Sequence, residues 1–192
     1  MQEFIFYFKL GWDHITEWGA LDHQLFITAL AAIYLLGDWK KLAVLVTAFT
    51  IGHSITLALS VLDIFRLPDH LVEFFIPCTI VITAISNLFA KGTDHKKIQT
   101  NYWFALFFGF IHGMGFANAL RFMLSSGENL GIGLLGFNIG LEVGQLLVVA
   151  LILIVAELVV SIFGVKRKNW ILFISAAIFS IALMMAVERL PL

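Results

Sequence analysis

Residues 132–160 read IGLLGFNIGLEVGQLLVVALILIVAELVV, and only Glu142 and Glu157 carry a charge over this whole length. A helix needs about 20 mainly apolar residues to cross the hydrocarbon core of a bilayer. This stretch exceeds that length, and a helix that is apolar on every face must be buried in protein or in lipid. The stretch therefore predicts a membrane-spanning helix.

Further apolar stretches before and after it extend this prediction to the whole chain. We expect an all-α bundle of about six membrane-spanning helices with short loops, forming a single transmembrane domain over residues 1–192. Residues 1–20 are too short and too charged to span the bilayer, so we expect them to form an interfacial lead-in. The predicted spans are residues 21–37, 40–62, 69–90, 101–124, 132–160 and 169–187.

The composition of the chain agrees with a membrane protein and excludes several other classes. Hydrophobic residues make up 60 % of the chain and charged residues 13 %, and the mean hydropathy is +0.96. Soluble domains contain about 25 % charged residues. A net charge of −1 provides no basic surface for nucleic acid, so we expect a lipid bilayer and no nucleic acid among the partners. A single cysteine, Cys78, excludes an internal disulfide and a thiolate zinc cluster.

The distribution of lysine and arginine predicts the orientation. The first, third and fifth predicted loops contain eight of these residues, whereas the opposite face contains four. Loops rich in lysine and arginine stay in the cytoplasm. We therefore expect an integral membrane protein, in a bacterial inner membrane, with both termini outside the cytoplasm.

Ionisable side chains inside predicted spans are the candidate functional residues, because they are costly in lipid. Histidine nitrogens and carboxylates together suit a divalent transition metal such as nickel, zinc, cobalt or iron. Each residue also has a structural alternative: Asp22 as a helix cap, His53 as a buried ring bonded to a threonine, and Glu142 as a neutral acid bonded to a neighbour. The candidate metal ligands are Asp22, His23, His53, His112 and Glu142.

Several polar residues share a helix face with these candidates or lie close to them. Thr50 lies one turn before His53, and Asn138 and Gln145 flank Glu142 on one face. His14 precedes the Asp22-His23 pair, and its role stays open. Glu73 at an outer helix end is either an accessory ligand or a simple interfacial acid. A stripe of Gly136, Gly140 and Gly144 indicates close helix packing, either within one bundle or between two copies in a homo-oligomer.

Four motifs in order along the chain carry a resemblance to a known family. They are GWDHITEWGALDHQLF (11–26), TAFTIGHSITLALS (47–60), FFGFIHGMGFA (107–117) and FNIGLEVGQL (137–146). The chain resembles the HupE/UreJ family of small membrane proteins, which are linked to hydrogenase and urease gene clusters and regarded as nickel or related-metal permeases. The match is closer to a divergent branch of the family. By analogy, the resemblance implies metal permeation. Within the first motif, it implies that Asp22 and His23 correspond to the family's Asp-His pair.

Three functions follow from these residues. The first is a permease for nickel or a related divalent metal, whose intramembrane site opens to the outer side and whose Glu142 also exchanges a proton. The second is an intramembrane zinc hydrolase that acts on a lipid or an amide, although the chain has no HExxH helix. The third is a metal sensor or chaperone subunit without transport, which the short loops disfavour because they offer little surface for a partner.

Overall fold

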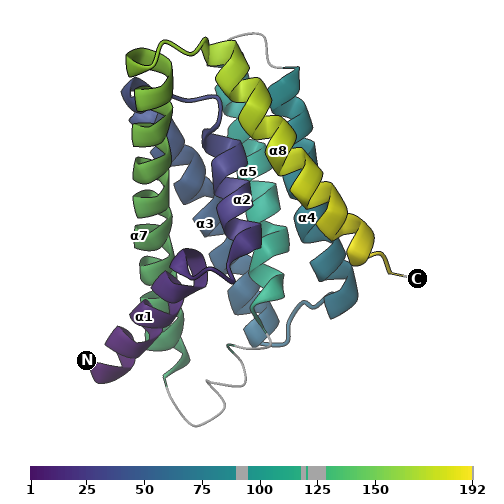
Figure 1. Cartoon of the computed structure of the whole chain (residues 1–192). Helices are drawn as coiled ribbons and strands as arrows, with labels where there is room; N and C mark the ends of the chain where they lie inside the picture. The colour runs from purple at the N-terminus through teal and green to yellow at the C-terminus, as the bar shows by residue number, and fades with distance from the viewer. Residues whose placement is uncertain (90–94, 118–119, 121–128, 192) are drawn as a thin grey trace.

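The computed structural model describes residues 1–89, 95–117, 120 and 129–191, and these residues are helical with no strand among them. Asn129 begins the long α7 helix, because its side chain accepts hydrogen bonds from the backbone nitrogens of Gly131 and Ile132. The helices are α1 (Gln2–Thr16), α2 (Leu21–Ala31), η1 (Leu36–Asp38), α3 (Trp39–Val61), α4 (Asp69–Leu88), α5 (His95–Gly115), α7 (Leu130–Glu157), η2 (Leu158–Ile162) and α8 (Arg167–Glu188) (Figure 1).

Four segments are long and apolar enough to cross a membrane, and they correspond to four of the six predicted spans. They are Leu36–Val61, Asp69–Leu88, Leu130–Ile162 and Arg167–Glu188. The predicted span 101–124 corresponds to α5 in part, since residues 118–119 and 121–124 lie outside the described residues. The prediction of one span over residues 21–37 was wrong. The α2 helix has only 11 residues, about 16 Å, which is half of a bilayer core of about 30 Å.

Residues 1–20, the expected interfacial lead-in, are mainly helical. Most of them form α1, which packs lengthwise along α7 and joins α2 near the middle of the bundle (Figure 1). The glycine stripe of α7 makes this contact possible. A Cβ on Gly140 would overlap the carbonyl oxygen of Phe8, and a Cβ on Gly136 would lie 2.8 Å from that of Phe4. The stripe is thus covered by α1 of the same chain.

The α3 and α5 helices pack closely against each other, and this is another extensive helix contact in the bundle. A Cβ on Gly113 would overlap the carbonyl oxygen of His53, and one on Gly52 would overlap that of Leu106. Small residues let helix backbones approach to this distance in membranes. The glycines around His112 therefore serve helix packing, and this packing places α5 against the segment of α3 that contains His53.

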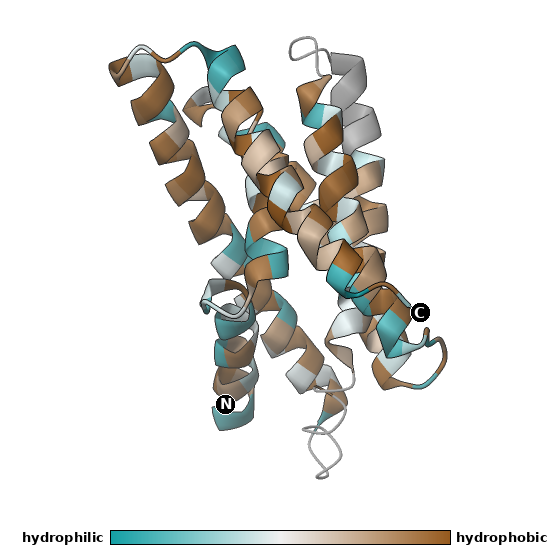
Figure 2. Ribbon diagram, turned by 45° about the vertical axis from the view of Figure 1, so that its right-hand side comes forward, coloured by the Kyte–Doolittle hydropathy of each residue, from teal (hydrophilic) through white to brown (hydrophobic). Residues whose placement is uncertain are grey.

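Both termini lie at the same end of the bundle, which we call the terminal end (Figure 1). The opposite end, the loop end, contains the α2–α3 and α7–α8 connections. Apolar residues predominate along the helices between the two ends (Figure 2). On α7 and α8 many of them face outward, including Leu151 and Phe173, which are 55 % and 71 % exposed. Lipid is the solvent that suits such surfaces.

Candidate metal centre

A break between α1 and α2 brings two histidines into the bundle. The last carbonyls of a helix have no partner within that helix. Here the side-chain nitrogen of Gln24 donates hydrogen bonds to the carbonyl oxygens of Ile15, at 3.2 Å, and Glu17, at 2.8 Å. These bonds hold the two helices together at the break. His14 in the last turn of α1 therefore lies beside His23 in the first turn of α2.

Three imidazole rings from three helices meet at this break: His14 from α1, His23 from α2 and His53 from α3. One ring nitrogen of each lies within 4.8 Å of the other two. The ring centroids of His14 and His23 are 4.6 Å apart, and that of His53 lies 6.2 Å from that of His14 and 6.0 Å from that of His23. Three histidines bound to one tetrahedral ion would place their nitrogens about 3.3 Å apart. Small side-chain movements would close the three rings around an ion.

Four of the six ring nitrogens in this group are buried without a hydrogen-bond partner. The Nε2 atoms of His14 and His23 and both ring nitrogens of His53 are buried without a partner. A buried polar atom left without a partner costs about 1–3 kcal/mol. A metal ion that accepts the nitrogen lone pairs would remove that cost. Unpartnered nitrogens from three helices at one point therefore fit a metal-binding group better than a structural hydrogen-bond network.

His112 of α5 is a neighbour of this group. Its ring centroid lies 5.1 Å from that of His23. Its Nε2 atom lies 3.0 Å from the hydroxyl of Thr79 on α4, whereas its Nδ1 atom is buried without a partner. The Thr79 bond fixes the orientation of the ring, as second-shell partners do for metal-binding histidines. His112 thus has one ring nitrogen left for an ion or a water molecule beside His23.

Aromatic rings enclose the histidines and keep water away from them. Phe116 and Phe137 stack on each other at 4.9 Å, and both lie against His14. Phe137 also lies nearly parallel to His53, with ring centroids 6.2 Å apart. Such an enclosure lowers the local dielectric, and an uncompensated charge in it is expensive.

Asp22 and Glu73 lie outside the group of three histidines. One carboxylate oxygen of Asp22 accepts a hydrogen bond from Arg189 at 3.1 Å, so this acid ties the start of α2 to the end of α8. The other oxygen of Asp22 is buried without a partner. Glu73 has an exposed side chain, and its carbonyl oxygen accepts a second bond from Arg189 at 3.4 Å. Arg189 thus contacts the carboxylate of Asp22 and the backbone carbonyl of Glu73.

Glu142 lies in a separate groove between α3 and α7, whose exposed lining is mainly apolar. It accepts a hydrogen bond from Thr47 at 2.6 Å, and Gln145 accepts one from Thr50 at 2.7 Å. The groove has a volume of about 410 Å³ and is also lined by Asn138. The sequence-based set of metal ligands is therefore divided: the structure brings His23 and His53 together with His14, places His112 beside them, and leaves Asp22 and Glu142 elsewhere.

Comparison with known proteins identifies the chain. The model of the family described as HupE / UreJ protein matches residues 1–189, which is nearly the whole chain. The chain belongs to the HupE/UreJ family. This family is associated with nickel and metal transport, which favours a transporter over an enzyme. No curated protein and no solved structure matches this HupE/UreJ protein.

Two features of the centre were not predicted from the sequence. Gln24 was not singled out, although a glutamine directly after Asp22-His23 in an apolar stretch is itself a signal of a buried hydrogen-bonding role. Thr79 was missed because one threonine in an apolar helix is common, and only the packing of α4 against α5 pairs it with His112. His14 was treated as an accessory residue, whereas in this HupE/UreJ protein it is one of the three grouped histidines.

Proposed function

We propose that this HupE/UreJ protein is a membrane permease for a divalent transition metal, and that His14, His23 and His53 hold the ion as substrate. The observation that carries the proposal is the approach of three buried imidazole nitrogens, one from each of three helices, to within 4.8 Å of one another. Association of the family with metal transport supports the same function. The metal is nickel or a neighbour with similar ligand preferences, such as zinc, cobalt or iron.

The form of the helices supports transport. Transporters commonly bind their substrate near the middle of the bilayer, where a membrane helix is interrupted. In this chain α1 and α2 form such an interrupted pair, and two of the three histidines flank the interruption. An ion bound there has protein on several sides, and a change in the angle between the two short helices would alter its access.

The direction of the path follows from charge. The loop end contains Lys40, Lys41, Lys166, Arg167 and Lys168, and loops rich in such residues stay in the cytoplasm. We propose that the loop end faces the cytoplasm and the terminal end faces outward, in a bacterial inner membrane. The ion would then enter from the terminal end and leave at the loop end.

Metal selectivity tests this function directly. Imidazole nitrogen suits nickel, zinc, copper and iron, whereas calcium and magnesium prefer oxygen ligands. In liposomes that contain the purified full chain, we expect uptake of Ni²⁺ or Zn²⁺ that persists in an about hundredfold excess of Mg²⁺ or Ca²⁺. Liposomes without protein are the control. Loss of uptake under excess Mg²⁺ would contradict a histidine site, and absence of uptake for every transition metal tested would contradict the permease.

Glu142 provides a test of which residues bind the ion. Because its carboxylate bonds to Thr47 in the α3–α7 groove, we expect Glu142→Gln to keep the metal-binding stoichiometry of the parent, with an affinity within about threefold. A neutral amide keeps an oxygen acceptor for the Thr47 hydroxyl. Isothermal titration calorimetry of the purified variant measures both quantities. A loss of stoichiometric binding would place Glu142 among the ligands.

The hydrolase alternative has little support, because neither candidate carboxylate base joins the histidine group. A zinc hydrolase needs a base within reach of the metal-bound water. Among the described residues, the carboxylates of Asp22 and Glu142 are bonded to Arg189 and Thr47 and lie outside the histidine group. We therefore propose transport and not hydrolysis.

A further inference from the structure

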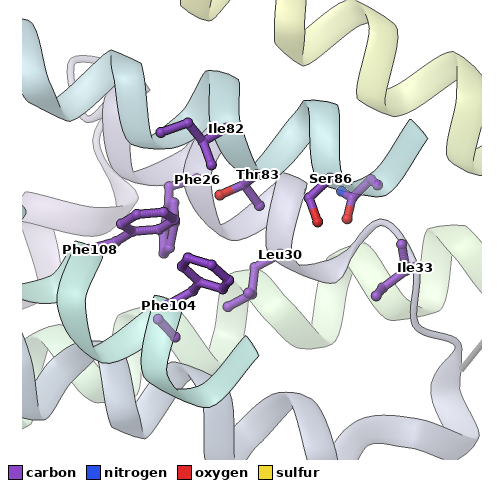
Figure 3. A pocket seen from close by; sticks show the side chains of 10 residues that line it. Phe26, Leu30, Ile33, Ile82, Thr83, Ser86, Phe104 and Phe108 are labelled. Atoms are coloured by element: carbon purple, nitrogen blue, oxygen red, sulfur yellow. The ribbon is translucent and has the colours of Figure 1, made fainter. Parts of the chain in front are cut away.

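A second cavity lies between α2, α4 and α5 and is partly open to the outside at Ile82, Ser86 and Phe104 (Figure 3). Its volume is about 90 Å³. At about 30 Å³ for each water molecule in the liquid, this space accommodates about three water molecules. Phe26 and Leu30 of α2 and Ile33 just after α2 line it, and Thr83 and Ser86 of α4 face them (Figure 3).

A polar stripe on α4 connects this cavity to the histidine centre. Thr79, Thr83, Ser86 and Asn87 recur at spacings that place them on one side of the helix. The stripe begins at the 3.0 Å contact between Thr79 and His112. From there Thr83, Ser86 and Asn87 line the cavity. In an otherwise apolar helix, such a line of hydroxyl and amide groups is expected where the helix faces water or an ion path.

Phe26 and Phe108 stand between the histidine centre and the cavity. The Phe26 ring centroid lies 5.2 Å from that of His112, and the same ring lines the cavity. Phe108 lies edge-on to Phe26, with centroids 6.0 Å apart. Both side chains are buried, at 1 % and 4 % exposure. They separate the space around the histidines from the space around the α4 stripe.

We propose that this cavity is the inner half of the ion path, where a partly hydrated divalent cation stays after it leaves the histidine centre. The proposal rests on the permease function proposed above. The Thr83 hydroxyl and the Asn87 amide nitrogen already donate to the carbonyl oxygens of Thr79 and Ala29. The side-chain oxygens of Thr83, Ser86 and Asn87 therefore accept hydrogen bonds from the water shell of the cation. In the positions seen here, the rings of Phe26 and Phe108 prevent a continuous open pore. A rotation of either ring connects the two sites.

Cysteine labelling tests the proposal, and the chain suits it because Cys78 is its single cysteine. In a Cys78→Ser background, Ser86→Cys places a thiol in the cavity and Ser54→Cys places one in the α3–α7 groove as the matched control. A cationic, membrane-impermeant methanethiosulfonate is applied from the loop-end side of full-length protein in liposomes. Labelling, its protection by Ni²⁺ or Zn²⁺, and ion uptake before and after labelling are measured.

We expect Ser86→Cys to be labelled, the metal to slow the labelling at least fivefold, and labelling to reduce uptake at least fivefold. Ser54→Cys should show neither metal protection nor loss of uptake. Absence of labelling at Ser86→Cys, or labelling without metal protection, would overturn the proposal. Metal protection at Ser54→Cys instead would assign the path to the α3–α7 groove and also overturn it.

Two measurements separate this inference from the permease itself. Uptake by the Cys78→Ser parent reports the permease function alone. Combining His53→Ala with Ser86→Cys should abolish uptake and leave the cavity thiol reactive, because the cavity is a separate space. An active parent with an unreactive Ser86→Cys would overturn only the inner path. An inactive parent would overturn the permease and, with it, the inner path, whatever the reactivity of Ser86→Cys.

Discussion

We expect His53→Ala to abolish stoichiometric binding of Ni²⁺ or Zn²⁺ and to remove metal uptake. His53 is fully buried, and both of its ring nitrogens lack partners in the protein. Replacing even a residue behind a metal ligand lowers affinity about 10–100-fold, so loss of a ligand itself should lower affinity more than about 100-fold. Elemental analysis of the purified protein and uptake in liposomes measure the two effects.

The fold should survive this substitution, because alanine removes two unpartnered polar atoms and leaves no protein donor or acceptor without its bond. Monodisperse elution in detergent checks that point. His70→Ala is the matched control, since His70 is exposed at the start of α4, and it should bind and transport metal as the parent does. Full metal binding and uptake by a well-folded His53→Ala protein would refute the histidine site.

The second large effect is expected from Gly140→Val, which separates α1 from α7. A Cβ at this position would overlap the carbonyl oxygen of Phe8, and backbone cannot move aside as a flexible side chain can. Overpacking of a core costs about 1–3 kcal/mol, and α1 is the helix that contributes His14. We therefore expect a lower thermal unfolding midpoint in detergent together with metal affinity as low as that of a His14→Ala variant.

Gly37→Ala is the control for this substitution. A Cβ at Gly37 would meet no atom within 4 Å, so neither the unfolding midpoint nor the metal affinity should change. The same control separates a general effect of losing a glycine from a specific effect of displacing α1. A Gly140→Val protein with the midpoint and affinity of the parent would show that the packing of α1 on α7 is not needed for the centre.

Prediction of the fold succeeded where composition alone decides the environment of a helix. Residues 132–160 and 169–187 are so apolar that only lipid or a large core suits them, and the structure has long apolar helices at both places. At the N-terminus, charged residues such as Lys9 and Asp13 indicated an interfacial segment, and the packing of α1 on α7 was not predicted. Its packing against α7 depends on glycines more than 120 residues away, and no local pattern in residues 1–20 reveals that contact.

Some residues of the histidine group could be singled out from the sequence for a similar reason. A histidine such as His53 stands out in an apolar stretch because it is costly there, whatever its partners are. Carboxylates stand out in the same way, but the free-energy cost of placing one in lipid does not reveal which residue pairs with it. Asp22 is bonded to Arg189, which is 167 residues away along the chain, and Glu142 to a threonine on α3. Depth in the membrane therefore predicted which residues are unusual, and could not predict which of them share a site.

The sequence by itself determined that this HupE/UreJ protein is an all-helical membrane protein, where most of its spans lie, and which side chains are too polar to be in lipid without a reason. These properties depend on the transfer of each segment from water to hydrocarbon, which is a sum over neighbouring residues. The tertiary structure alone decided that α1 and α2 form a broken pair and that His14, His23 and His53 meet. Their approach depends on glycine-mediated contacts between helices that are distant in the sequence. These contacts fix the angles and distances between helices, which the hydropathy of a single segment does not determine.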